Sequence, residues 1–279
     1  MTTTAPAPVR TFPAPPFASE FVDSEAVGDI KSMIIYGEPG TWKTTVGAGI
    51  CRVPKFANGK GLIIDIDNGT EVLSNEPDIQ AKIASGQINI FPIDKTSIDA
   101  WGKLEYIINE VVNTDYGYDW VMLDTLDVAQ EVVIEHLLAT TLNDKGQPDT
   151  RGAWGKVSAV VGKWMWAFQN TSHFVGVTVM HSKDGTDDGG AFKIKPKLAG
   201  SLKDNLAGIP SLVAYVDFRE DSEKVTHLVA TIGKSSITST KNRYKMVDDI
   251  WDFDLPKLYA TIESREEVAH SATVTPATV

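Results

Sequence analysis

The feature that most constrains the fold is the stretch from Met33 to Thr45, which reads MIIYGEPGTWKTT. Its first four residues are apolar or aromatic and suit a buried strand, and the glycine-rich run that follows ends in Lys-Thr-Thr. The next segment, Val46 to Ile50, suits a helix. A strand, a glycine-rich loop and a helix in this order form a P-loop, whose backbone N–H groups converge on phosphates. The sequence therefore predicts a phosphate-binding loop over residues 37–45.

The residue types in this loop match the chemistry of a nucleotide bound with Mg²⁺. Lys43 would neutralise charge on the β- and γ-phosphates, the Thr44 hydroxyl would hold Mg²⁺, and the helix N-terminus would add its dipole. The alternative is a glycine-rich turn that precedes a helix by chance. The predicted nucleotide-binding residues are Gly37, Glu38, Pro39, Gly40, Thr41, Trp42, Lys43, Thr44 and Thr45.

One position departs from the usual pattern G-x-x-x-x-G-K-[ST], because Trp42 stands where the second glycine is expected. A residue with a Cβ fits there only if its φ is negative and its side chain points away from the phosphates. We therefore expect a negative φ at Trp42.

Composition and charge narrow the class of protein. The 279 residues suffice for one large domain, and the net charge of −11 argues against a surface that is basic throughout, although it leaves room for a local basic groove. The single Cys51 excludes an intramolecular disulfide and a cysteine metal cluster. No apolar run has the length of a membrane span and no signal pattern opens the chain, so we expect no membrane association.

The chain divides into three parts by composition. Residues 1–28 begin with a run rich in Pro, Ala and Thr and predict a flexible arm, residues 29–263 predict the folded domain, and residues 264–279 predict a flexible tail. Within the domain, apolar runs suited to strands alternate with helical patterns, and two late strands over 212–218 and 226–232 form a hairpin. This order predicts an α/β fold: a mainly parallel sheet with helices on both faces and a C-terminal β-hairpin. The other expected strands cover 62–64, 88–93, 120–123 and 174–180, and the expected helices cover 101–112, 128–142 and 154–168.

Ligands of such sheets bind beyond the carboxyl ends of the strands, so polar residues at strand ends are the next candidates. Asp124 follows the apolar run Trp120 to Leu123 and would hold Mg²⁺ together with Thr44. Thr125 would orient the water shell of the metal, or would cap the next helix.

Two further strand ends carry titratable side chains. Asp67 would activate or position the attacking water, and the alternative is a turn formed by Asp67-Asn68-Gly69. Asp65 points to the same face as Asp67, and their repulsion would raise one pKa. His181 follows the strand over 174–180 and would contact the γ-phosphate, or would be a hydrogen-bonded surface residue.

Together these segments resemble a RecA-fold ATPase, and most closely the phage nucleotide-binding proteins that act in recombination as single-strand annealing ATPases. The resemblance spans about Ser32 to Arg243 and implies a RecA-like P-loop NTPase core with ATP and Mg²⁺ as cofactors. In RecA-like proteins a Glu catalytic base stands where Asp67 lies, and a γ-phosphate sensor stands where His181 lies. The segments that carry the resemblance are 37–45, 65–69, 120–125, 175–181, 196–204 and 241–243.

The same resemblance implies DNA-facing loops over 143–155 and 182–202. Cations there would follow phosphates, and an aromatic ring would stack on a base. Alternation places the three lysines 193, 195 and 197 on one face of an extended segment. The alternative is a pair of solvated loops. The predicted DNA-binding residues are Lys145, Arg151, Lys183, Phe192, Lys193, Lys195 and Lys197.

RecA-like hexameric helicases and related ATPases carry a Lys-x-Arg pair after the hairpin strands, where Lys241 and Arg243 stand here. The pair would reach the ATP of a neighbouring subunit and stabilise transition-state charge, or would be ordinary surface. With it, the predicted catalytic residues are Lys43, Asp67, Asp124, His181, Lys241 and Arg243.

The sequence thus predicts an ATP-hydrolysing, single-stranded-DNA-binding recombination or annealing protein that acts as a ring or filament. We expect it in the cytoplasm, that of the host cell if a phage encodes it. The alternatives are a nucleotide-gated scaffold with little hydrolysis and a hexameric motor that translocates along DNA.

Overall fold

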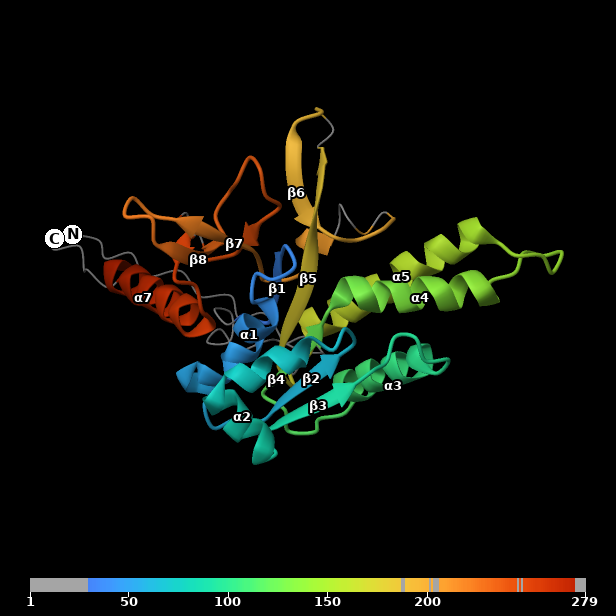
Figure 1. Cartoon of the computed structure of the whole chain (residues 1–279), viewed down its shortest axis with the longest axis horizontal. Coiled ribbons are helices and arrows are strands. Elements are labelled where there is room, and N and C mark those ends of the chain that lie inside the picture. The colour runs from blue at the N-terminus through green and yellow to red at the C-terminus, as the bar shows by residue number, and fades with distance from the viewer. Residues whose placement is uncertain are drawn as a thin grey trace, which may run out of the picture.

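The computed structural model describes residues 30–186, 189–200, 202, 206–244, 246 and 248–273 (Figure 1). The arm predicted for residues 1–28 lies outside these described residues. The boundary predicted between the domain and the tail, at residue 264, falls within helix α7 (Leu255–Thr273). Buried Leu255, Leu258 and Ile262 anchor the first turns of this helix to the domain.

A ten-stranded sheet forms the centre of the domain, in the order β10-β8-β7-β1-β5-β4-β2-β3, with β6 and β9 paired to β5 and β7. Six strands run parallel, and the late strands β8, β9 and β10 pair antiparallel, as the α/β pattern predicts. The strands are β1 Ser32–Gly37, β2 Gly61–Asp65, β3 Ile88–Pro92, β4 Trp120–Asp124, β5 Val175–Thr186, β6 Phe192–Pro196, β7 Leu212–Glu220, β8 Thr226–Thr231, β9 Lys241–Asn242 and β10 Ile250–Trp251.

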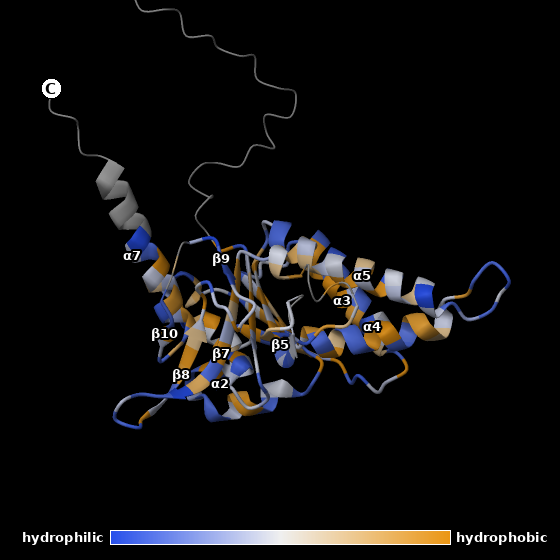
Figure 2. Ribbon diagram, turned by 90° about the horizontal axis from the view of Figure 1, so that it is seen from above, coloured by the Kyte–Doolittle hydropathy of each residue, from blue (hydrophilic) through white to orange (hydrophobic). Residues whose placement is uncertain are grey.

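Helices cover both faces of the sheet, as expected. Side chains alternate along β1, so Met33 and Ile35 enter one hydrophobic core while Ile34 and Tyr36 enter the other. The first core packs against α1, α2 and α7, and the second against α3, α4 and α5, which lie together on the other side in Figure 2. The remaining helices are α1 Lys43–Ala48, α2 Pro77–Ala84, α3 Ala100–Asn113, α4 Leu126–Thr140 and α5 Thr150–Asn170, with short 3-10 helices at Gly49–Arg52, Pro54–Phe56, Gly69–Asn75 and Leu206–Gly208.

Two elements extend further than the sequence pattern indicates. Helix α5 begins at Thr150, because the side chain of Asp149 accepts a hydrogen bond from the Gly152 N–H and caps the helix. Strand β5 continues past Met180 to Thr186 and pairs with β6, so part of the loop expected over 182–202 is a β-hairpin. This hairpin stands out from the sheet at the top of Figure 1.

Within the described part of the chain, none of the helices combines the length and the apolar character that crossing a membrane requires.

Candidate nucleotide-binding site

The loop between β1 and α1 has the backbone that the P-loop pattern predicts. A Cβ added to Gly37 would lie 2.3 Å from the carbonyl oxygen of Val216, and Gly40 has a φ of +84°. Only glycine satisfies both positions without moving the neighbouring backbone. The loop therefore holds its shape through the two glycines that the sequence retains.

The expectation for Trp42 was wrong, because its φ is +56° and its ψ is 25°, the left-handed conformation that glycine would adopt. The indole ring is 62% exposed and packs edge-on against Phe218, with ring centroids 5.0 Å apart and an interplanar angle of 85°. This aromatic contact offsets part of a backbone cost of about 1–2 kcal/mol.

Lys43, the first residue of α1, lies buried inside the loop. Its Nζ donates to the carbonyl oxygen of Glu38 at 2.5 Å and to Thr41 Oγ1 at 3.3 Å. Burial lowers the pKa of Lys43 to about 8, although the charges of Asp124, Asp127 and Glu38 oppose this shift. Phosphate oxygens entering the loop would replace these neutral acceptors and favour the charged ammonium.

Thr44 and Asp124 meet as predicted, with Thr44 Oγ1 donating to Asp124 Oδ2 at 2.7 Å. Asp124 is fully buried, and burial raises its pKa to about 6. Among the described residues, Asp124 Oδ1 and Thr125 Oγ1 have no hydrogen-bond partner. Thr125 stands at the N-cap of α4 without a capping side-chain bond, and its peptide bond with Asp124 is cis.

The carboxylate of Asp124 and the hydroxyl of Thr44 are oxygen donors that fit a divalent cation. A Cβ added to Gly69 would lie 2.9 Å from Asp124 Oδ2 and 3.0 Å from Thr44 Oγ1, so glycine leaves the space beside both oxygens open. Mg²⁺ prefers a small number of protein oxygens completed by phosphates and water. Thr44 and Asp124 are therefore the residues that would hold Mg²⁺.

The two carboxylates after β2 have different environments. The strand ends at Asp65, whose Oδ1 accepts from the Gly69 N–H at 3.1 Å and whose Oδ2 accepts from the N–H and hydroxyl of Thr70. Asp65 therefore uses both of its carboxylate oxygens to close the following turn. Asp67 is 35% exposed, and its Oδ1 lies 3.8 Å from Lys95 Nζ.

One cavity of about 190 Å³, which we call the phosphate pocket, brings most of the predicted residues together. It joins the P-loop to the end of β4, to the middle of β5 and to the segment after β2. Its lining consists of Gly40, Trp42, Lys43, Thr44, Thr45, Asp67, Gly69, Val72, Asp124, Thr125, Val179 and His181.

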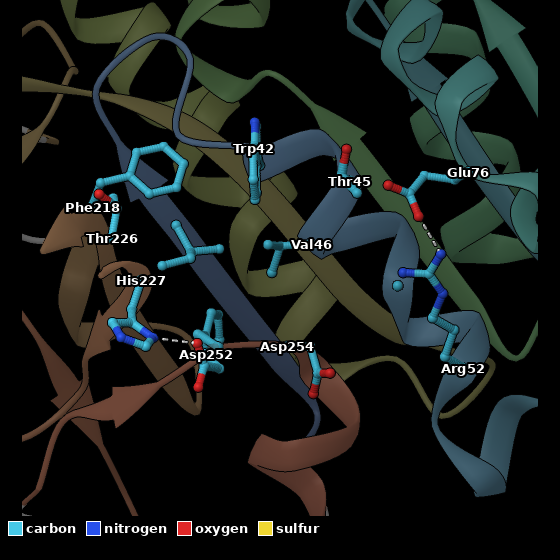
Figure 3. Close-up of a pocket in the computed structure, with 13 residues that line it drawn as sticks. Trp42, Thr45, Val46, Arg52, Glu76, Phe218, Thr226, His227, Asp252 and Asp254 are labelled. Atoms are coloured by element: carbon cyan, nitrogen blue, oxygen red, sulfur yellow. Dashed lines mark hydrogen bonds and ion pairs between the residues drawn. The ribbon is translucent and has the colours of Figure 1, made fainter. Parts of the chain in front are cut away.

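A second cavity of about 570 Å³, which we call the apolar pocket, lies on the other side of the start of α1 (Figure 3). It shares Trp42 and Thr45 with the phosphate pocket. Sequence reasoning missed it, because its walls come from segments far apart in the chain. Its lining consists of Trp42, Thr45, Val46, Gly49, Arg52, Glu76, Phe218, Thr226, His227, Leu228, Asp252, Phe253 and Asp254.

Polar groups at the edges of the apolar pocket are paired. Arg52 forms an ion pair with Glu76 at 2.5 Å, and His227 Nδ1 lies 2.7 Å from Asp252 Oδ1. Hydrogen bonds to Asp252 and Asp221 raise the pKa of His227. The pocket therefore offers aromatic and aliphatic surface between two charged rims.

His181 lines the phosphate pocket, and its main partner is Asp127, a residue that sequence reasoning missed. The His181 N–H donates to Asp127 Oδ1 at 3.0 Å, and His181 Nδ1 lies 2.9 Å from Asp127 Oδ2. Burial raises the pKa of Asp127, but the hydrogen bonds from His181 outweigh it and bring the pKa below its usual range. Lys197 Nζ lies 3.5 Å from Asp127 Oδ2 and 3.3 Å from Glu131 Oε1.

Lys241 and Arg243 lie away from the phosphate pocket of their own chain. Strand β9 pairs with Leu212 and Val213 at the start of β7, whereas the P-loop follows the end of the parallel strand β1. Lys241 Nζ donates to the carbonyl oxygen of Gly208, and Arg243 Nη2 donates to that of Ile209 at 3.4 Å. Burial lowers the pKa of Lys241, and the charge of Arg243 adds to this effect.

The predicted DNA-binding residues fall in two separate places. Lys145 lies in the connection between α4 and α5, and Arg151 lies in the first turn of α5 instead of a loop. The connection between α4 and α5 and the β5–β6 hairpin lie well apart in both Figure 1 and Figure 2. The hairpin and its base carry the remaining residues, namely Lys183, Phe192, Lys193, Lys195 and Lys197.

The lysines of the hairpin and its base have different hydrogen-bond and ion-pair partners. Lys193 Nζ donates to the carbonyl oxygens of Ser235 and Ser236 at 3.3 and 3.1 Å, and Lys183 Nζ donates to that of Leu198. Lys197 follows β6 and is ion-paired at the base of the hairpin. Phe192 is 55% exposed.

The mainly parallel sheet, the P-loop and the Thr44–Asp124 contact define a P-loop ATPase domain of the α/β type. A family model described as AAA domain matches residues 30–244, and the chain belongs to this family. No curated protein matches the chain. Among solved structures, the flagellar accessory protein FlaH from Methanocaldococcus jannaschii is similar, with a TM-score of 0.43 and 13% identity over 75% of this chain and 82% of that one.

Proposed function

We propose that this protein binds Mg–ATP and hydrolyses it to ADP and phosphate. The observation that carries the proposal is the convergence of Lys43, Thr44 and Asp124 in one pocket, with a buried carboxylate oxygen unpartnered among the described residues. A buried acceptor without a partner is costly, and a bound cation would remove that cost. Bound Mg²⁺ would supply charge neutralisation at the phosphates.

The two cavities suggest how the nucleotide lies. Because Trp42 and Thr45 border both, a triphosphate that follows the start of α1 would place its γ-phosphate in the phosphate pocket and its nucleoside in the apolar pocket. Val46 and Phe218 offer apolar contact to a flat base. Asp67 would position the attacking water, and His181 would contact the γ-phosphate.

We further propose that the protein acts on single-stranded DNA as a recombination or annealing ATPase. The projecting β5–β6 hairpin supports this, because it combines lysines with the exposed ring of Phe192. Lysines follow a phosphate backbone, and an exposed aromatic ring stacks on a base. Lys145 and Arg151 form a second basic site at the far end of α4 and α5.

We also propose that the active unit is a ring or filament. Lys241 and Arg243 lie away from their own P-loop, and this supports a role at the nucleotide of a neighbouring subunit. A cation placed there would stabilise transition-state charge in trans.

ATP turnover with and without single-stranded DNA tests these proposals. We expect measurable turnover that rises modestly with DNA, and Lys43→Ala should abolish tight Mg–ATP binding because the loop loses its side-chain cation. A protein that binds ATP without turnover would be the nucleotide-gated scaffold. Strong stimulation together with strand displacement would indicate the translocating motor. Wild-type binding by Lys43→Ala would refute the site itself.

The salt dependence of DNA binding tests the hairpin. Changing Lys193 and Lys195 together to Ala should reduce the log–log salt slope by about 1.4 units for single strands, since each phosphate contact contributes about 0.7. Lys197 is left in place because it is ion-paired. The matched control changes the exposed Lys55 and Lys60 to Ala. An unchanged slope in the hairpin variant would exclude the hairpin from the DNA interface.

A further inference from the structure

Asp127 is a buried carboxylate that the proposed chemistry has so far left without a role. It lies in the first turn of α4 with a side chain that is 2% exposed, and both of its oxygens face His181. Burial of a charged group costs free energy unless the group is paired. Its hydrogen bonds to His181 and its proximity to Lys197 provide the pairing that keeps it ionised.

This pairing determines which ring nitrogen of His181 carries a proton in the neutral side chain. An ionised carboxylate only accepts hydrogen bonds, so Nδ1 must donate to Asp127 Oδ2 and Nε2 keeps its lone pair. Among the described residues Nε2 has no hydrogen-bond partner, and His181 borders the phosphate pocket. The ring therefore presents a proton acceptor on its other edge.

We propose that His181 accepts the proton of the attacking water and that Asp127 is the positioning residue that makes this possible; the inference rests on the proposed ATPase function. The water oxygen bonds to the γ-phosphorus, and the bond from that phosphorus to the β–γ bridging oxygen breaks with its electron pair leaving on ADP. The water proton passes to His181 Nε2. The imidazolium is stabilised by Asp127 and later returns the proton to the phosphate.

The alternative acceptors are less well arranged. Asp65 uses both oxygens to close its turn. Asp67 is 35% exposed and lies 3.8 Å from the Lys95 ammonium, so it is suited to orienting the water that His181 deprotonates.

Several charged groups lie near the pair. Lys197 contacts both Asp127 and Glu131. Lys43, Asp67 and Asp124 line the phosphate pocket together with His181.

Asp127→Asn is the decisive variant, because it preserves the shape of the side chain while it removes the charge and reverses the hydrogen bond to His181 Nδ1. Asn Oδ1 can still accept from the His181 N–H, while its amide donates to Nδ1 and forces the ring proton onto Nε2. We expect kcat to fall at least about a hundredfold, the scale of general-base loss, with the Kd of an ATP analogue unchanged.

His181→Ala provides a second measurement should Asp127→Asn fold poorly. We expect the same loss of kcat, and added imidazole should restore part of it, which a merely structural role would not allow. The control pair is His173 and Asp115, whose Nδ1 and Oδ2 lie 3.9 Å apart near the surface; Asp115→Asn and His173→Ala should leave kcat unchanged.

The outcomes separate this inference from the proposed function. A wild-type protein that binds ATP without hydrolysing it overturns the ATPase function, and the role of His181 with it. Wild-type hydrolysis whose rate Asp127→Asn leaves unchanged overturns only the role of the Asp127–His181 pair. A His181→Ala protein with full activity, or one that imidazole does not restore, overturns the proton-acceptor role.

Discussion

The left-handed backbone at Trp42 can be tested by comparing Trp42→Ala with Trp42→Gly. Both variants lose the edge-on contact with Phe218, so that contribution of about 0.5–1.5 kcal/mol cancels between them. They differ by one methyl group at a φ of +56°. Alanine in this left-handed conformation destabilises the folded state by about 1–2 kcal/mol relative to glycine. Glycine loses more backbone entropy on folding, and this loss offsets only part of its advantage.

We therefore expect Trp42→Gly to be more stable than Trp42→Ala by about 1 kcal/mol, which corresponds to about 2–4 °C in Tm for a domain of this size. Urea and thermal unfolding followed by circular dichroism, without nucleotide, measure the difference. The control is the exposed Glu105 in α3, where helix propensity makes Glu105→Ala the more stable of the Ala and Gly variants by about 1 kcal/mol. If Trp42→Ala equals or exceeds Trp42→Gly in stability, the positive φ at this position is refuted.

Three further predictions concern the nucleotide site. Gly69→Ala adds a Cβ 2.9 Å from Asp124 Oδ2. It should therefore weaken the Mg²⁺-dependent binding of a fluorescent ATP analogue at least about tenfold, which corresponds to about 1.4 kcal/mol of binding free energy. Binding with an unchanged Mg²⁺ dependence would place the cation elsewhere. Asp124 must be ionised to hold Mg²⁺, and Lys43 must be charged to hold phosphate. Because the pKa of Asp124 is raised to about 6 and that of Lys43 is lowered to about 8, the affinity for Mg–ATP should fall below about pH 6 and above about pH 8. Calorimetric titration at several pH values measures this affinity, and an affinity without a maximum between about pH 6 and about pH 8 would contradict the assignment. Arg243→Ala and Lys43→Ala proteins, each inactive alone, should regain ATPase activity when mixed, because some interfaces then pair an intact P-loop with an intact trans cation; co-assembly without activity would exclude the trans role.

Local sequence patterns predicted the centre of this site. The P-loop and the strand that ends in Asp124 are contiguous runs of residues, and the apolar strands that carry them are almost entirely buried. Lys43, Thr44 and Asp124 consequently lie where the pattern places them. The order of strand and helix signals likewise predicted the mainly parallel sheet, since each signal depends on neighbours within one element.

Features that depend on distant contacts were not predictable. Asp127 and His181 are 54 positions apart and meet only because α4 begins beside β5. The apolar pocket draws its walls from α1, β7, β8 and the segment after β10, and no single run of residues signals it. The φ of Trp42 follows from the path of the loop and overrides the preference of the residue.

Strand β5 runs without interruption from the core, beside β1, into the projecting hairpin. His181 pairs with Gly37, and Lys183 lies two residues further along the same strand. Side chains alternate along a strand. A residue an even number of positions after His181 therefore lies on the same face as His181, and a residue an odd number of positions after it lies on the opposite face. Inserting one residue after His181 would turn the outer part of β5 over while leaving the nucleotide site intact. The number of residues along β5 therefore fixes how the faces of the hairpin are oriented relative to the phosphate pocket.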